Sequence, residues 1–100
     1  MIAFHIEWSP LARVNLTSIN EYISEDSPAA ADRQIEIILS VIDRLIDFPE
    51  MGRPGRCRRT RELVVSGTPY IVAYRLKPSV IQILAIMHGA RRWPRNFRVE

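Results

Sequence analysis

The sequence predicts an α+β fold, in which a twisted, mainly antiparallel sheet packs on an N-terminal α-helical hairpin. Three observations lead to this prediction. A short alternating segment comes first, two segments with helical spacing follow it, and three segments rich in β-branched residues come last. The expected element order is therefore β-α-α-β-β-β. One hundred residues, of which 47% are hydrophobic, suffice for one core, so residues 1–100 are expected to form a single domain.

Residues 2–8 are expected to form the first strand, because large apolar side chains alternate with small or polar ones. The large apolar residues are Ile2, Phe4, Ile6 and Trp8. A period of two is typical of a strand with one buried face, so this segment should lie against the helical hairpin.

Two serine–proline pairs mark the starts of the helices. Ser9-Pro10 and Ser27-Pro28 each place an N-cap residue before proline at the first helical position. The first helical pattern stops near Asp26, and the second runs in steps of three and four from 31 to 46, ending before Pro49. So short a link folds the two helices back into a hairpin. Their outward faces should carry most of the acidic residues: Glu21, Glu25, Asp32, Glu36, Asp43 and Asp47.

Residues 49–60 contain two prolines, two glycines and four arginines, which indicates a loop. Strands are expected at about 61–66, 69–76 and 80–88, joined by the turn sequences 66–69 and 77–79 in tight hairpins. The last strand is apolar on both faces over much of its length, which favours a central or well-covered position in the sheet.

The two halves of the chain carry opposite charge. Residues 1–50 hold three arginines against nine acidic residues (−6), and residues 51–100 hold eleven basic residues against two glutamates (+9). Nine of the fourteen basic residues form two clusters: Arg53, Arg56, Arg58, Arg59 and Arg61, then Arg91, Arg92, Arg95 and Arg98. Guanidinium groups bind phosphate or carboxylate through paired hydrogen bonds. We therefore expect one side of the domain to face a polyanion or an acidic partner.

Several classes of protein are not expected from this sequence. No apolar run approaches the length of a bilayer span, and the N-terminus does not resemble a secretion signal, so no membrane partner is expected. The single cysteine, Cys57, cannot form an internal disulfide, which suits the cytoplasm. Neither a metal site nor a nucleotide-binding glycine loop is expected, and we predict no cofactor.

Five motifs along the chain resemble, in order, those of the RelE/ParE superfamily of toxins from bacterial type II toxin–antitoxin systems. They are W-S-P-L-A (8–12), F-P-E-M-G-R (48–53), T-R-E-L-V (60–64), P-Y-I-V-A-Y-R (69–75) and H-G-A-R-R-W (88–93). The resemblance implies a small cytoplasmic toxin in a hetero-oligomer with a cognate antitoxin encoded by an adjacent gene.

Members of this superfamily differ in their targets. RelE-like toxins cut mRNA on the ribosome, whereas ParE-like toxins act on DNA gyrase. RelE-like sites usually carry an arginine where this chain has Tyr70, and lysines where it has Arg61 and Glu62. These departures favour the ParE-like hypothesis, in which the chain binds gyrase without chemistry of its own. Its expected target-binding residues are Arg58, Arg59, Arg61, Arg91, Arg92, Trp93 and Arg95.

The alternative is a metal-independent, ribosome-dependent mRNA endoribonuclease. It needs a base for the 2′-hydroxyl proton, an acid for the leaving oxygen and cations on the phosphate. The main catalytic candidates are His88 as base with Arg61 and Arg91 on the phosphate; Glu62 could also be the base, Tyr70 or Tyr74 the acid, and Arg92 a further phosphate contact. Some of these residues also have a purely structural interpretation. His88 could bond the backbone at the end of a strand, Glu62 could form an ion pair with an arginine, and the two tyrosines could pack in the core.

A third possibility is a family member that has lost its toxicity and only binds antitoxin. In every case we expect an antitoxin segment whose apolar anchors fill grooves beside the helical hairpin or the sheet edge, and whose acidic residues neutralise the arginine clusters.

Overall fold

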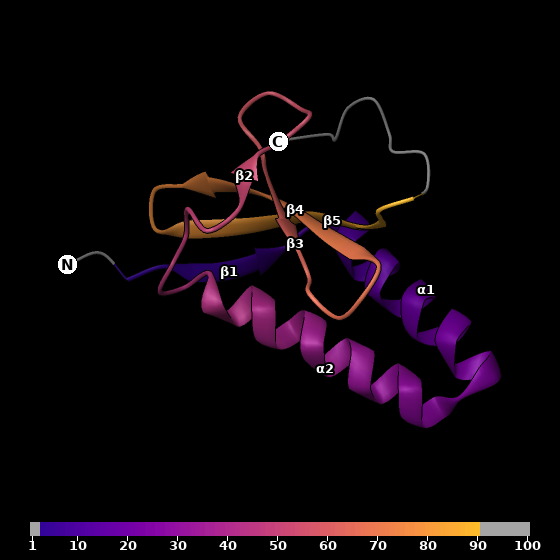
Figure 1. Cartoon of the computed structure of the whole chain (residues 1–100). Coiled ribbons are helices and arrows are strands. Elements are labelled where there is room, and N and C mark those ends of the chain that lie inside the picture. The colour runs from indigo at the N-terminus through magenta and orange to yellow at the C-terminus, as the bar shows by residue number, and fades with distance from the viewer. Residues whose placement is uncertain (1–2, 91–100) are drawn as a thin grey trace.

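A computed structural model of the chain describes residues 3–90, which form two layers, a sheet and a helical hairpin (Figure 1). The elements in chain order are β1 (His5–Trp8), α1 (Pro10–Asp26), α2 (Pro28–Arg44), β2 (Arg53–Pro54), β3 (Arg61–Val64), β4 (Tyr70–Lys77) and β5 (Val80–His88). The sheet order is β1-β5-β4-β3-β2, with β1 parallel to β5 and the other pairs antiparallel. The predicted fold class is confirmed.

Both helices begin where the serine–proline pairs place them. Ser9 Oγ accepts a hydrogen bond from Ala12 N (3.1 Å), and Ser27 Oγ accepts one from Ala30 N (3.1 Å). Ser9 Oγ also donates to Leu84 O at 2.9 Å, which fixes the start of α1 against β5. The caps therefore set where the helices start and how the first one meets the sheet.

The second helix ends earlier than its apolar stripe suggests. The α-helix stops at Arg44, and Leu45, Ile46 and Asp47 continue it only as turns whose N–H groups bond three residues back. Such tightening of the last turn is common where carbonyl groups lack a further helical partner. The side chain of Leu45 remains completely buried, which explains the long apolar pattern.

The last strand was expected to have a central or well-covered position, and the structure confirms this. β5 lies between β1 and β4 and pairs with β4 along the whole length of that strand, from Tyr70 opposite His88 to Lys77 opposite Val80. The strand β2, which sequence reasoning treated as loop, pairs Arg53 with Glu62 and Pro54 with Arg61. Proline is tolerated there because β2 is an edge strand.

The pairing of β4 with β5 has a register irregularity between Ala73 and Tyr74, and both faces of the sheet carry apolar clusters. The face toward the helices holds the helix-side core, whose largest fully buried side chains include Tyr74, Ile38, Leu45, Ile81 and Ile83. A second group, here called the open-face cluster, comprises Ala73, Leu84 and Ala85 with Cys57 and Met87 packed against it.

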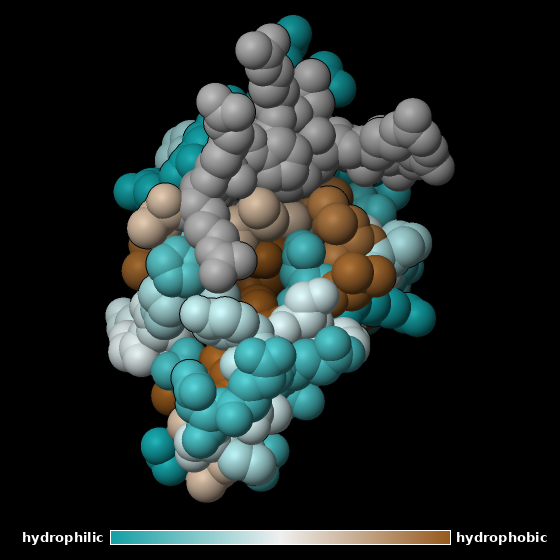
Figure 2. Space-filling model, turned by 90° about the vertical axis from the view of Figure 1, so that its right-hand side faces the viewer, coloured by the Kyte–Doolittle hydropathy of each residue, from teal (hydrophilic) through white to brown (hydrophobic). Residues whose placement is uncertain are grey.

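The acidic residues of the hairpin lie outward, as predicted. Every one of the six, Glu21, Glu25, Asp32, Glu36, Asp43 and Asp47, is exposed. Figure 2 shows hydrophilic residues over the end of the hairpin and hydrophobic residues gathered above them. Within residues 3–90, no helix combines the length and the apolarity needed to cross a membrane.

Candidate target-binding surface

The arginine loop, residues 53–61, has a fixed shape although it is mostly irregular. Gly55 N donates to Thr60 O (2.8 Å), and both N and Oγ1 of Thr60 donate to Cys57 O (3.2 and 2.6 Å). A side chain at Gly55 would collide with Thr60 Oγ1, so this close approach requires glycine. Cys57 packs on the open-face cluster, and the loop therefore lies over part of the face that the helices leave uncovered.

The carboxylate of Glu62 holds two arginines of the loop. Its side chain is only 4% exposed. Oε2 accepts a hydrogen bond from Arg56 N at 2.7 Å and lies 3.5 Å from Arg56 Nε, while Oε1 lies 3.6 Å from Arg53 Nη2. The interpretation of Glu62 as an ion-pair partner is confirmed, and the backbone contact shows that it also shapes the loop.

Arg61 lies on the opposite face of β3 from Glu62. It pairs with Tyr74, whose side chain belongs to the helix-side core. Its guanidinium donates from Nη1 to Gly52 O (2.7 Å) and to Glu50 O (3.4 Å), and Nη2 lies 3.8 Å from Glu50 Oε1. Arg61 thus helps to hold the segment before β2 against the sheet.

Arg58 and Arg59 differ from the other three arginines of the loop. Both are exposed, and neither forms an ion pair with any residue between 3 and 90. The backbone of Arg59 has a φ of +63°, which turns the chain at the loop tip. The predicted cluster of five therefore divides into three compensated arginines and two that remain open to a partner.

His88 ends β5 beside α1, away from the arginine loop. Its ring meets the ring of Tyr70 edge to face, with centroids 5.7 Å apart, and Nδ1 accepts a hydrogen bond from Ala90 N at 3.2 Å. Both residues line a hollow of about 360 Å³ with Asn15, Ser18 and Tyr22 of α1. The backbone bond agrees with the structural alternative considered for His88.

The structure does not bring His88 and Arg61 together. Four residues along β4 and two strand spacings across the sheet separate them, which is roughly 16 Å between backbones. The other predicted residues, Arg91, Arg92, Trp93 and Arg95, lie outside the described part of the chain. Among the residues described, no three His, Cys, Asp or Glu side chains gather as a metal site.

For Tyr74, which was also a candidate acid, the alternative of a packed tyrosine is confirmed, but sequence reasoning missed the hydrogen bonds of its hydroxyl group. The Tyr74 hydroxyl donates to Pro49 O (2.8 Å) and accepts from Gly52 N (2.9 Å), so a fully buried side chain ties β4 to the segment leading into β2. Burial raises the pKa of Tyr74 above its ordinary value of 10.0. The only available signal was the alternation along β4, which places Tyr74 on the buried face.

Comparison with known proteins places these features in context. Residues 6–93 match the family model described as the ParE toxin of the type II toxin–antitoxin system parDE. The protein Y4kP of Sinorhizobium fredii, described as a candidate toxin, is 43% identical over 89 residues, which cover 89% of this chain and 92% of Y4kP.

Two toxins of Caulobacter vibrioides are also similar. Toxin RelE3 is 35% identical over 89 residues, covering 87% of this chain and 96% of its own, and toxin RelE2 is 36% identical over 86 residues, covering 86% and 96%. A solved chain of the chromosomal ParDE toxin–antitoxin system of P. aeruginosa shares the fold, with a TM-score of 0.79 and 24% identity, over 88% of this chain and 98% of that one.

Proposed function

Since the chain belongs to the ParE toxin family of type II toxin–antitoxin systems, within the RelE/ParE superfamily, we propose that it inhibits DNA gyrase by binding and is neutralised by its cognate antitoxin. In this proposal the toxin performs no chemistry. Arg58 and Arg59 of the arginine loop make the principal described contacts, and Arg61 adds a secondary one because its guanidinium already bonds Gly52 O. Arg91, Arg92, Trp93 and Arg95 are proposed as further contacts with the target.

One observation carries the choice of a binding mechanism: His88 and Tyr70 are in contact, but the candidates for binding the phosphate and the alternative base lie elsewhere and have other partners. Arg61 bonds the segment before β2, Glu62 is buried between Arg53 and Arg56, and His88 lies on the far side of β4. General acid–base catalysis needs its groups within hydrogen-bond reach of one substrate. Binding needs only that exposed charges face the partner, and Arg58 and Arg59 meet that condition.

Charge reversal at the loop tip tests this function. The double variant Arg58→Glu/Arg59→Glu should inhibit gyrase supercoiling less than the unmodified toxin by at least about tenfold, because like charges opposed in an interface cost several kcal/mol. The matched control is Arg13→Glu/Arg33→Glu, which makes the same change of net charge at exposed helical positions. Equal inhibition by both variants, or no inhibition by the unmodified toxin, would count against the proposal.

The second candidate function is ribosome-dependent mRNA cleavage, the activity of the RelE-like branch of the superfamily, whose name the two Caulobacter relatives carry. His88 would then be the base, with Arg61 and Arg91 on the phosphate. Mapping of RNA ends in cells that produce the toxin separates the two functions. Codon-positioned cuts that disappear in His88→Ala would establish cleavage, whereas altered plasmid supercoiling with intact messages supports the gyrase proposal.

The antitoxin should compensate the open arginines with acidic residues. We expect its affinity for the toxin to fall as salt concentration rises, because exposed charge pairs are screened over about 8 Å at physiological ionic strength. Titration calorimetry at salt concentrations from about 50 to 500 mM measures this salt dependence, because the screening length becomes shorter over that range. In Arg58→Glu/Arg59→Glu the salt dependence should become shallower, and an unchanged dependence would contradict the role of these two residues.

A further inference from the structure

The tip of the arginine loop is a turn that holds arginine where glycine is favoured. Residues 57–60 form this turn, and the hydrogen bond from Thr60 N to Cys57 O closes it at 3.2 Å. Arg59 is its third residue and has a φ of +63°. Glycine and asparagine are favoured at such a position, because other side chains strain the backbone there. The turn therefore keeps an arginine at a cost in stability, which indicates that the guanidinium group has a function.

A buried carboxylate supports the basic surface of the loop. The side chain of Glu62 is 4% exposed, whereas the side chains of Arg53 and Arg56 that pair with it are 62% and 49% exposed. Glu62 thus positions two guanidinium groups without presenting negative charge to a partner. With the two arginines of the tip, four arginines stand against one carboxylate and give a net charge of +3, apart from Arg61 on the other face of β3.

The arginine loop has no large apolar side chain that could anchor a protein. Residues 53–61 include no aromatic residue and no leucine, isoleucine, valine or methionine, and Cys57 packs on the open-face cluster. The core of a protein–protein interface is typically rich in aromatic side chains and depleted of charge. Protein–DNA interfaces are more polar and much more positive. The composition of the loop therefore favours the phosphates of DNA over an acidic protein surface.

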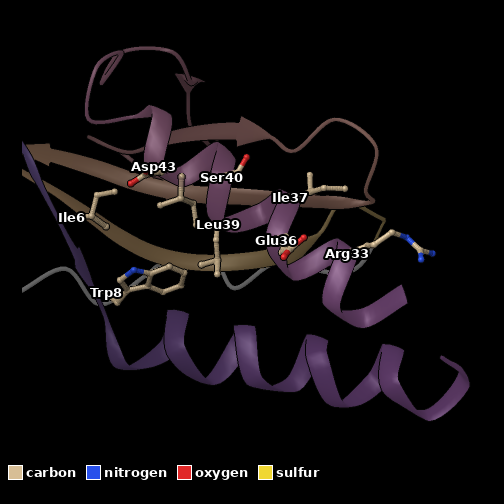
Figure 3. Close-up of a pocket in the computed structure, with 9 residues that line it drawn as sticks. Ile6, Trp8, Arg33, Glu36, Ile37, Leu39, Ser40 and Asp43 are labelled. Carbon is tan, nitrogen blue, oxygen red and sulfur yellow. The ribbon is translucent and has the colours of Figure 1, made fainter. Parts of the chain in front are cut away.

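The opposite side of the molecule repels DNA. The helical hairpin lies on the other side of the sheet from the arginine loop (Figure 1). A hollow of about 910 Å³ lies there between β1 and α2, and the exposed residues Glu36 and Asp43 are among those that line it (Figure 3). A polyanion that approaches the toxin is attracted at the loop and repelled at the hairpin, so it meets the loop side.

From these features we propose that the arginine loop binds phosphate groups of the duplex DNA on which gyrase acts. Guanidinium groups bind phosphate oxygens through paired hydrogen bonds, and such contacts do not depend on base sequence. Arg58 and Arg59 make the contacts at the tip, and Arg53 and Arg56 extend them along the loop. The proposal rests on the proposed function, because gyrase brings the DNA to the toxin, but the contact itself needs no gyrase.

The salt dependence of DNA binding by the isolated toxin tests the contact. Fluorescence anisotropy of a labelled duplex of arbitrary sequence measures the binding constant as salt rises from about 50 to 200 mM. Its logarithm should fall against the logarithm of salt concentration with a slope of about −3 or steeper, because each phosphate contact contributes about −0.9. Arg58→Gln/Arg59→Gln should make the slope shallower by about 2. The matched control Arg13→Gln/Arg33→Gln removes two exposed helical charges and should leave the slope unchanged.

The variant Arg59→Gly separates a role in binding from a role in folding. Glycine adopts a φ of +63° without strain, so this variant should unfold at the same urea concentration as the unmodified toxin or at a higher one. Its slope for DNA binding should nevertheless be shallower by about 0.9. A lower urea midpoint with unchanged DNA binding would show that Arg59 serves the fold and not the contact.

A gyrase supercoiling assay with the same variants separates failure of this proposal from failure of the proposed function. The DNA contact is wrong if the toxin does not bind the duplex, or if Arg58→Gln/Arg59→Gln and the control give equal slopes. Loss of gyrase inhibition in Arg58→Gln/Arg59→Gln would then assign the tip to an acidic surface of gyrase itself. Conversely, DNA binding that depends on Arg58 and Arg59 without any inhibition of gyrase would support the contact and refute the proposed function.

Discussion

Replacement of Glu62 by alanine is expected to lower the free energy of unfolding of the isolated toxin by about 2 kcal/mol. The carboxylate is almost fully buried, and it accepts a hydrogen bond from Arg56 N and lies beside the guanidinium groups of Arg53 and Arg56. Removing it leaves the Arg56 N–H without its acceptor and two cations close together without an anion between them. The arginine loop should therefore lose its shape as well as stability.

Urea denaturation of the isolated toxin, followed by circular dichroism, measures the change. The control is Glu50→Ala, because Glu50 is 77% exposed and lies 3.8 Å from Arg61. An exposed pair of this kind contributes about 0–1 kcal/mol. Glu62→Gln should fall between the two, since the amide oxygen can still accept from Arg56 N. Equal midpoints for Glu62→Ala and Glu50→Ala would refute the structural role assigned to Glu62.

The architecture was predictable from the sequence because its signals are local. The two serine–proline pairs define where α1 and α2 begin, since capping and proline geometry involve neighbouring residues only. The apolar character of residues 80–88 indicated a covered strand, and β5 does lie inside the sheet. The short strand β2 was missed because Arg53 and Pro54 have no strand pattern of their own and pair only through β3.

The candidate site was less predictable because it depends on which face of a strand each residue occupies. Arg61 and Glu62 are neighbours in sequence, yet they point to opposite sides of β3 and serve different networks. The five arginines that cluster in the sequence therefore have different surroundings in the structure. Arg53 and Arg56 pair with Glu62, Arg61 pairs with Glu50, and the two at the loop tip are exposed. The separation of His88 from Arg61 likewise follows from strand register, which one sequence does not fix.

The two sides of the toxin carry opposite charge, because the helical hairpin is acidic and the tip of the arginine loop is basic. The outward carboxylates keep polyanions from the helical face, while Arg58 and Arg59 attract them at the loop tip.

Loss of a single hydroxyl group in Tyr74→Phe is expected to cost about 1–3 kcal/mol of stability. The phenyl ring still fills the helix-side core, but Pro49 O loses its donor and Gly52 N loses its acceptor in a buried place. Gly52→Ala should weaken the same contact from the other side, because a Cβ there would lie 2.8 Å from Tyr74 Cε1 and from the Tyr74 hydroxyl oxygen. The two changes share one contact, so their effects in the double variant should sum to less than the separate costs.

The pH dependence of stability distinguishes Tyr74 from an ordinary packed aromatic residue. Burial raises the pKa of Tyr74 above 10.0, so above that pH the unfolded chain loses this proton before the native state does. The native state then binds more protons, and stability falls as pH rises from 10.0 toward the folded pKa. Tyr74→Phe should lack this part of the decline, whereas Tyr22→Phe, at a position 60% exposed, should retain it. Parallel stability profiles for Tyr74→Phe and the unmodified toxin between about pH 9 and 11 would show that Tyr74 is not held neutral by burial.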